Sequence, residues 1–312
     1  MLSQQTKIGL ALSSGGAKGI AHVGVLRALE DARIPIHLLV GSSMGGLVAA
    51  FYAAGHSTAE IEQLCRSMRL FDIIQRDRSG MGLLGQDRIA ALLQGALGDL
   101  TFDQLNLPLA LVAADLETGE EVIICEGSVV EGMLATMALP VIFPPRHWNG
   151  RLLIDGGVIN PIPFDIARQM GADHVIAVHT RHALPSIGEM LETTPLHRGQ
   201  GARAAVRTLR HRSRWSLLHH ISERSVGIMS RRLIEQRLQE APPDLMIEVL
   251  FKDVELLDLD QIDLCLAAGE NAARQCMSKL IEIRDTSLRT IEPIGERRHA
   301  SNYLAQSPSF AH

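Results

Sequence analysis

Short apolar runs alternate along the chain with longer segments in which apolar residues recur at helical spacing. The apolar runs predict buried strands over residues 7–12, 36–40, 107–114, 121–125, 151–154, 174–179 and 245–250. The periodic segments predict helices over residues 17–32, 46–55, 58–68, 88–97, 129–137, 164–170 and 260–283. Strands that alternate with helices predict an α/β fold whose mostly parallel sheet is covered by helices on both faces.

One internal segment, residues 197–237, is strongly basic in an otherwise acidic protein. It holds ten arginines and two glutamates, and its apolar residues are spaced loosely as on one helical face. Such a segment can lie on an anionic membrane surface, or it can be a solvated helical cover whose arginines pair with acids elsewhere. We expect one domain over residues 1–285 that includes this basic cover, followed by a polar tail over residues 286–312.

The composition of the 312 residues limits the classes of function. A net charge of −5, a pI near 6.2 and an aromatic content of 4% argue against nucleic acid as a partner. The four cysteines are spread without metal-ligand spacing, so we expect no metal site. The sequence shows no signal-peptide pattern and no apolar run near the ~18 residues of a membrane span. We therefore expect a cytoplasmic protein that can meet a membrane only at its surface.

Ser43 lies in the sequence Gly41-Ser42-Ser43-Met44-Gly45, which fits the G-x-S-x-G pattern. An apolar run precedes this pentapeptide, and a run of small residues with helical character follows it. In this strand–turn–helix context a serine is lifted out of the fold, and the free N–H groups of the following helix point toward whatever it attacks. Gly41 and Gly45 allow other backbone to approach the turn closely. Ser43 is therefore a candidate nucleophile.

Two further loops follow predicted strands, at the edge where open α/β sheets build their sites. The first contains Gly15 and Gly16, whose consecutive N–H groups can bind the oxygen anion of a tetrahedral intermediate, and Lys18 can add a positive field. This loop can also be read as a dinucleotide phosphate loop, but Ser14 stands where the first glycine of that motif belongs. The second loop contains Asp155, which is either a candidate base or a turn aspartate that caps the next segment.

A serine nucleophile needs a base, and the sequence offers two solutions. In the first, a histidine that follows Asp155 in the chain completes a triad with Ser43. The available histidines are His179, His182 and His197. The first of these is favoured because it ends a predicted strand. In the second solution Asp155 contacts Ser43 directly as a dyad, which requires partial desolvation to raise the pKa of its carboxyl. His22 lies on the first predicted helix and is expected to face its neighbours.

Together these motifs resemble the patatin-like phospholipase family. The segments that carry the resemblance are residues 15–19, 41–45, 114–119, 135–145 and 155–157. The resemblance covers residues 7–180 and is greatest to the small bacterial members, near the catalytic domains of neuropathy-target-esterase-like proteins. It implies a three-layer α/β/α sandwich and hydrolysis of acyl esters in phospholipids, lysophospholipids or simpler lipid esters. Because the sequence holds no ligand cluster, we expect neither a metal nor an organic cofactor.

The roles that the resemblance implies carry over position by position. Ser43 is implied as the nucleophile and Asp155 as the base of a dyad without histidine. The oxyanion hole is implied at the N–H groups of Gly15, Gly16 and Ala17. The supporting positions are Lys18, Gly19, Gly41, Gly45, Gly156 and Gly157. The sequence departs from the family at Ser14, in the place of the family's first glycine, which can shift the oxyanion donors slightly.

The leading hypothesis is thus a serine lipid-ester hydrolase that works through an acyl-enzyme. A triad esterase of the α/β-hydrolase type and an acyltransferase are the alternative enzymes, and both would need a histidine partner. A lipid-surface or protein-binding module with a vestigial site is the non-enzymatic alternative. The intact pair of Ser43 and Asp155 argues against that last hypothesis.

Overall fold

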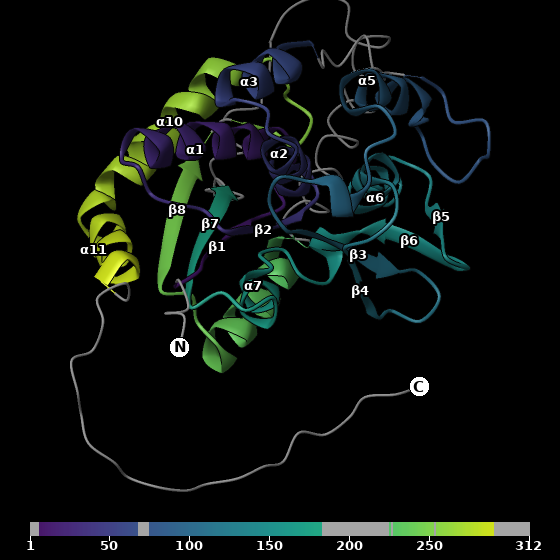
Figure 1. Cartoon of the computed structure of the whole chain (residues 1–312). Coiled ribbons are helices and arrows are strands. Elements are labelled where there is room, and N and C mark those ends of the chain that lie inside the picture. Colours follow the sequence, from purple (N-terminus) through teal and green to yellow (C-terminus); the bar gives the residue numbers. More distant parts are fainter. Residues whose placement is uncertain (1–5, 68–74, 183–224, 226, 253, 290–312) are drawn as a thin grey trace, which may run out of the picture.

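In the part of the chain that the structure describes, eight strands form one mixed sheet between two layers of helices (Figure 1). The computed structural model describes residues 6–67, 75–182, 225, 227–252 and 254–289. The strands are β1 (Ile8–Leu12), β2 (Leu38–Ser42), β3 (Leu109–Asp115), β4 (Glu121–Ile124), β5 (Arg146–Trp148), β6 (Arg151–Asp155), β7 (His174–His182) and β8 (Leu245–Phe251). The labelled helices are α1 (Ala21–Asp31), α2 (Met44–Ala53), α3 (Thr58–Ser67), α5 (Asp87–Leu97), α6 (Val129–Thr136), α7 (Phe164–Gln169), α10 (Ile262–Gln275) and α11 (Met277–Arg289), and a further helix covers 227–240.

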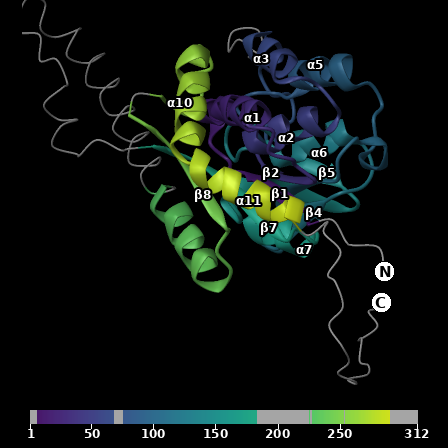
Figure 2. The ribbon, with the colours of Figure 1, turned by 60° about the vertical axis from the view of Figure 1, so that its left-hand side comes forward.

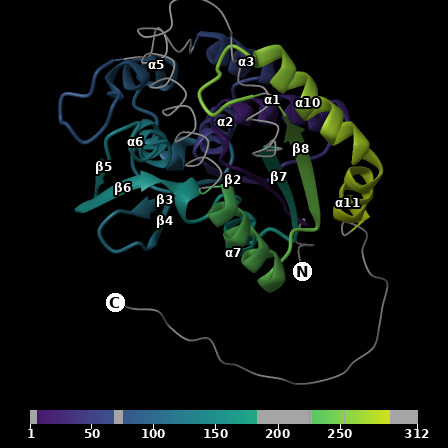
Figure 3. The same cartoon turned by 180° about the vertical axis from the view of Figure 1, so that it is seen from behind.

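The two helical layers bury different faces of the sheet. Helices α1, α2, α3, α5, α6 and α10 lie on one face, and α7 lies with the helix over 227–240 on the other (Figure 2, Figure 3). Along β2, Leu39 packs into the first layer and Val40 into the second, because successive side chains of a strand point to opposite faces. Strands β1, β2 and β3 are buried throughout, as central strands covered on both faces should be. The predicted three-layer sandwich is confirmed.

The order of strands in the sheet is β5-β6-β3-β2-β1-β7-β8, with β4 paired to β3. The pairs among β3, β2, β1, β7 and β8 are parallel, and the pairs of β3 with β4, of β3 with β6 and of β5 with β6 are antiparallel. The sheet is therefore mostly parallel, as predicted. Among the described residues, no helix combines the length and the apolar character needed to cross a membrane.

Strand β3 brings the ends of β2 and β6 together. Strand β4 pairs with four residues along one edge of β3. The other edge of β3 pairs first with β2, in parallel, and then with β6, antiparallel, so that β2 and β6 run toward each other. In this register Ser42 lies opposite Val112, and Asp155 lies opposite the next residue, Ala113. The last residues of two strands far apart in the sequence thus become neighbours.

Several element boundaries differ from those predicted from the sequence. The helix predicted over 17–32 begins as a 3₁₀ turn, Gly16–Ile20, before α1 continues it. The helix predicted over 260–283 is divided into α10 and α11, because the backbone of Cys276 leaves the helical conformation at φ −95° and ψ 6°. The sequence predicts no strand over Arg146–Trp148, where β5 forms a hairpin with β6.

The basic segment 197–237 lies mostly outside the described residues, and so does the predicted tail 286–312, apart from its start in α11. The end of the basic segment belongs to the helix beside α7. There the guanidinium of Arg237 forms ion pairs with the carboxylates of Asp165 and, at 3.2 Å, of Glu121. These half-buried pairs hold the helix on the α7 face of the sheet, while membrane contact by this segment stays a prediction.

Helices α1 and α10 pack against each other through two glycines. A Cβ at Gly24 would lie 2.1 Å from the carbonyl oxygen of Leu266, and a Cβ at Gly269 would lie 2.0 Å from that of Ala21. Glycine is required because any side chain there would collide with the backbone of the other helix. This contact fixes the late helix α10 against the helix that follows the glycine loop.

We predict that Gly24→Ala and Gly269→Ala each lower the free energy of unfolding by about 1–3 kcal/mol, because each forces the two backbones apart. Gly95→Ala is the matched control, since nothing lies within 4 Å of a Cβ at this position in α5. That control should raise the free energy of unfolding by about 0.5–1 kcal/mol through helix propensity. Urea denaturation followed by circular dichroism measures all three, and equal stability of Gly24→Ala and Gly95→Ala would contradict the close helix contact.

Candidate active site

Ser43 lies at the sharp turn between β2 and α2, and its side chain is half-buried. Its backbone has φ 55° and ψ −126°, a conformation that residues other than glycine rarely adopt. The turn is tight on both sides. A Cβ at Gly45 would lie 2.4 Å from the carbonyl oxygens of Leu12 and Ser13, and a Cβ at Gly41 would lie 2.4 Å from the backbone of α2. The two glycines therefore make room for a strained serine at the end of a buried strand.

Thr136, at the end of α6, holds the Ser43 turn in place. The N–H of Ser43 donates to Thr136 Oγ1 at 2.9 Å, and the Thr136 hydroxyl donates in turn to the carbonyl oxygen of Val112 in β3. Thr136 is fully buried, and its hydroxyl gives both backbone groups a partner within the protein. The sequence gives Thr136 no such role, although the residue lies in the segment 135–145 that resembles the patatin-like family.

The hydroxyl of Ser43 pairs with the carboxylate at the end of β6. Ser43 Oγ donates to Asp155 Oδ2 at 2.6 Å, and the N–H of Gly157 donates to Asp155 Oδ1 at 2.7 Å. The backbone N–H of Asp155 donates to the carbonyl oxygen of Ala138 at 2.9 Å. Both carboxylate oxygens and the backbone are thus fixed, and the side chain of Asp155 is buried.

Burial sets the acidity of this carboxyl. Removal from water raises the pKa of Asp155 to about 6, although the hydrogen bonds from Ser43 and Gly157 favour its ionised form. A carboxyl with a pKa near 6 is still ionised at neutral pH, and it accepts a proton more readily than one at the ordinary value near 4. The structure therefore provides the desolvation that a Ser–Asp pair without histidine requires.

The glycine loop between β1 and α1 contacts both other motifs. A Cβ at Gly157 would lie 2.8 Å from Ser14 Oγ, and a Cβ at Gly19 would lie 2.5 Å from Met44 Cγ. The loop with Asp155 and the turn with Ser43 therefore both pack directly on the glycine loop. The three motifs, separated in the sequence, meet at one end of the sheet.

The N–H groups of the glycine loop are not equivalent. A Cβ at Gly15 would lie 2.2 Å from Thr180 Oγ1, and Gly16, at φ +56°, would place a Cβ 2.2 Å from the carbonyl oxygen of Leu256. The N–H of Ala17 donates to that same oxygen at 2.8 Å, so it is already paired. Among the loop and cap hydrogen bonds of the described residues, none uses the backbone N–H of Gly15 or of Gly16. These two are the candidate oxyanion donors.

The other supporting residues have structural reasons for their places. Lys18 is buried, and its Nζ donates to the carbonyl oxygen of Val254 at 3.3 Å. Lys18 thus ties the glycine loop to the segment that also supplies the partner of Ala17. Gly156 has no room for a side chain, since a Cβ there would lie 2.1 Å from the carbonyl oxygen of Val112.

The charged partner of His179, the histidine favoured for a triad, is a glutamate rather than Asp155. This histidine lies on β7 with its Nδ1 4.0 Å from Glu248 Oε1, and burial lowers its pKa to about 4. The side chain of His182 and the whole of His197 lie outside the described residues. The hydrogen bond of the Ser43 hydroxyl goes to the carboxylate instead, which favours the dyad over the triad.

His22 is enclosed by its neighbours. Its Nε2 lies 2.8 Å from the carbonyl oxygen of Ser13, directly before the glycine loop. Burial lowers the pKa of His22 to about 4, so the ring is neutral at neutral pH and Nε2–H can donate to this carbonyl. His22 therefore supports the backbone that leads into the loop.

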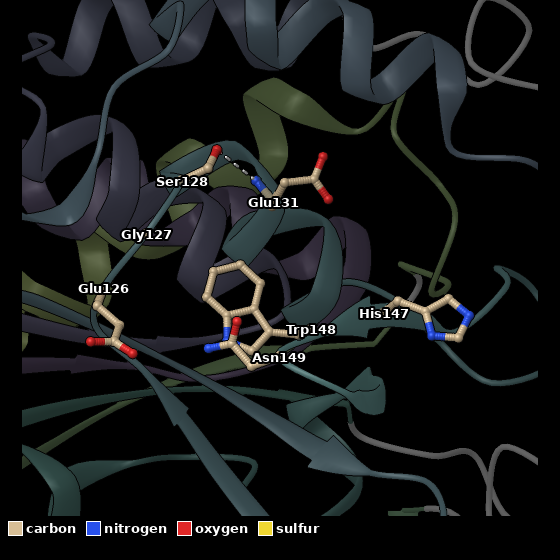
Figure 4. Close-up of a pocket in the computed structure, with 7 residues that line it drawn as sticks. All are labelled: Glu126, Gly127, Ser128, Glu131, His147, Trp148 and Asn149. Carbon is tan, nitrogen blue, oxygen red and sulfur yellow. Dashed lines mark hydrogen bonds between the residues drawn. The ribbon is translucent and has the colours of Figure 1, made fainter.

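A pocket of about 400 Å³ lies apart from these residues, at the start of α6 and the turn between β5 and β6 (Figure 4). It is lined by Glu126, Gly127, Ser128, Glu131, His147, Trp148 and Asn149. Within it, the N–H of Glu131 donates to Ser128 Oγ at 3.4 Å (Figure 4). Because α6 ends at Thr136 and β6 ends at Asp155, the pocket and the Ser43 pair are at opposite ends of both elements.

Comparison with known proteins matches residues 10–168 to the family described as patatin-like phospholipase. The chain belongs to this family. The match includes all three motifs that meet at the end of the sheet. The crystal structure of VipD from Legionella pneumophila has the same fold, with a TM-score of 0.55 at 14% identity over 88% of this chain and 67% of that one.

Two relatives illustrate the family at higher identity. An uncharacterized NTE family protein of Mycobacterium tuberculosis is 34% identical over 179 residues, which are 56% of this chain and 49% of that protein. Human patatin-like phospholipase domain-containing protein 6 is 33% identical over 179 residues, which are 55% of this chain and 13% of that protein. The aligned parts thus span about half of the mycobacterial relative and a small part of the human one.

We predict that Thr136→Val lowers the free energy of unfolding by about 2–4 kcal/mol, because the N–H of Ser43 and the carbonyl of Val112 both lose a buried partner. Thr136→Ser is the matched control: it keeps the hydroxyl, removes one methyl group and should cost only about 1 kcal/mol. Chemical denaturation of the two variants checks this difference. If valine were tolerated as well as serine, the hydroxyl would not be holding the turn.

Proposed function

We propose that this protein is a serine hydrolase that cleaves carboxylic esters of phospholipids or lysophospholipids through an acyl-enzyme on Ser43 and Asp155. The observation that carries the proposal is the 2.6 Å hydrogen bond between a serine at a strained strand–helix turn and a buried carboxylate. Family membership supports the lipid substrate. Glycerophospholipids carry their acyl chains as carboxylic esters, which is the bond that an activated serine attacks.

In the acylation step, Ser43 Oγ attacks the carbonyl carbon of the ester while its proton passes to Asp155 Oδ2. The carbonyl oxygen becomes an anion. The N–H groups of Gly15 and Gly16, in the glycine loop, donate hydrogen bonds that stabilise this anion. The bond from the carbonyl carbon to the alkoxy oxygen then breaks. Asp155 returns its proton to that oxygen, so the alcohol leaves and the acyl group stays on Ser43.

Deacylation repeats these roles with water as the nucleophile. A water molecule gives a proton to Asp155 as its oxygen attacks the acyl carbonyl, and the same N–H groups stabilise the second oxyanion. The bond between the carbonyl carbon and Ser43 Oγ breaks, and Asp155 returns the proton to the serine. The fatty acid is released, and the pair is restored. A single base near pKa 6 can serve both directions because it is poised close to neutral pH.

A variant series on a short-chain ester such as p-nitrophenyl butyrate tests this proposal. We expect Ser43→Ala to lower kcat/KM by at least about 10³-fold and Asp155→Asn by about 10²–10⁴-fold, since they remove the nucleophile and its base. His179→Gln should keep kcat/KM within about three-fold, because that side chain faces Glu248. Ser67→Ala, at an exposed helix end, is the control for loss of a hydroxyl.

Two results would decide against the dyad. If Ser43→Ala and Asp155→Asn kept the activity of the unchanged protein, neither residue would be part of the chemistry. If replacement of one of the histidines at 179, 182 and 197 abolished turnover, a triad would replace the dyad. Product analysis with an added alcohol acceptor separates hydrolysis from acyl transfer, since a transferase would give mainly the new ester.

A further inference from the structure

The loop that follows the candidate site is apolar at every position and partly open to solvent. Residues 139–145 read Leu-Pro-Val-Ile-Phe-Pro-Pro, and none of them is fully buried. Pro140 is exposed, and Val141 is 71% exposed. The loop begins directly after Ala138, whose carbonyl oxygen accepts the backbone N–H of Asp155. An apolar surface therefore starts within a few residues of the proposed base.

A second exposed loop, between Arg76 and Leu84, adds to this surface. Its turn is organised by the carboxylate of Asp77, which accepts hydrogen bonds from the Ser79 hydroxyl and from the backbone N–H groups of three loop residues. These contacts fix the chain so that Met81 is 51% exposed and Leu83 is 62% exposed. A turn that is held by several hydrogen bonds therefore exposes these two apolar side chains to solvent.

The two loops are joined through their backbones. The N–H of Leu83 donates to the carbonyl oxygen of Val141 at 2.9 Å, and the N–H of the next residue, Leu84, donates to that of Ile142 at 2.8 Å. A Cβ at Gly82 would lie 2.7 Å from the backbone nitrogen of Pro144, so the loops are in close contact. Met81, Leu83, Pro140 and Val141 thus form one surface, which we call the apolar rim.

Backbone strain at the apolar rim indicates that the exposure is a property of the fold. Val141 has φ 72°, although its β-branched side chain strongly disfavours this region. The strained peptide is held by the hydrogen bond from Leu83. A bulky apolar residue that is both strained and exposed gains little from packing against the described residues, and such exposure is typical of a surface that binds a partner or a membrane.

We propose that the apolar rim docks on the surface of an anionic lipid aggregate and brings the Ser43–Asp155 pair to the substrate. This inference rests on the proposed function, since lipid esters are held in such aggregates. The charge around the apolar rim fits this occupant: Arg76 and Arg78 precede Met81 in the same loop and are exposed, while the carboxylate of Asp77 accepts hydrogen bonds from its own loop. Apolar side chains next to exposed arginines suit a surface with anionic head groups above acyl chains.

Vesicle binding in a Ser43→Ala background tests the docking without hydrolysis of the lipid. With vesicles of phosphatidylcholine and phosphatidylglycerol, we expect the double change Met81→Ser/Leu83→Ser to weaken binding by at least about ten-fold, because two inserted apolar side chains are lost. Val141→Asn should weaken it as well, and asparagine tolerates the backbone at φ 72°. Leu264→Ser is the matched control, since Leu264 is 47% exposed on α10, and it should bind as the background does.

A second readout separates docking from chemistry. In the protein with Ser43 intact, the ratio of activity on phospholipid vesicles to activity on a soluble short-chain ester should fall by at least about ten-fold in the Met81→Ser/Leu83→Ser variant. Unchanged vesicle binding, or an equal loss on both substrates, would overturn the docking proposal. The proposal would also be overturned if the Met81→Ser/Leu83→Ser change dissociated a dimer of this chain and left vesicle binding unchanged, because the apolar rim would then be an interface between two copies. Full esterase activity in Ser43→Ala would instead refute the proposed function and leave the vesicle-binding result readable.

Discussion

The other contacts of the site hold Ser43 and Asp155 in the positions that allow the hydrogen bond between them. This hydrogen bond exists because β2 and β6 meet head-on along one edge of β3, which places the residue after one strand beside the last residue of the other. The same burial raises the pKa of Asp155 from near 4 to about 6. The folded state therefore loses stability as the pH rises from about 4 through 6, because the unfolded chain ionises this carboxyl more easily. In the proposed mechanism, this loss of stability is offset by a carboxylate that accepts the serine proton more readily.

One short segment, from the last residue of α6 into the loop that follows, connects the nucleophile, the base and the apolar rim. Thr136 accepts the N–H of Ser43, Ala138 accepts the N–H of Asp155, and Val141 accepts the N–H of Leu83. Two of these contacts hold backbone in positions that cost energy, at Ser43 and at Val141 itself. Strained positions persist where the surrounding structure fixes them, and they cluster at functional sites. The segment links the proposed chemistry to the surface from which a lipid would enter.

The sequence predicts what local patterns encode and misses what depends on contacts across the fold. Strand–helix alternation predicts the sheet, and glycine-flanked motifs single out Ser43 and Asp155. Thr136 holds the Ser43 turn through a hydrogen bond to β3, and no local sequence pattern marks a buried threonine as making such a contact. The N–H of Ala17 is paired with the carbonyl oxygen of Leu256, which lies 239 positions further along the chain. The sequence cannot show such a distant contact, so it suggests three oxyanion donors where the structure leaves two candidates. The helix break at Cys276 falls within a segment whose apolar residues keep helical spacing throughout, so the sequence pattern gives no sign of the break.

The pH dependence of covalent labelling of Ser43 by a fluorophosphonate tests whether Asp155 activates the serine, because it reports the ionisation of that carboxyl. We expect a labelling rate that rises between about pH 5 and 7 with an apparent pKa near 6, since only ionised Asp155 can accept the serine proton. We expect Asp155→Asn to be labelled slowly and without this transition. A labelling rate that is flat from pH 4.5 to 8 (roughly the range over which this carboxyl titrates), or a transition that survives in Asp155→Asn, would contradict this role of Asp155.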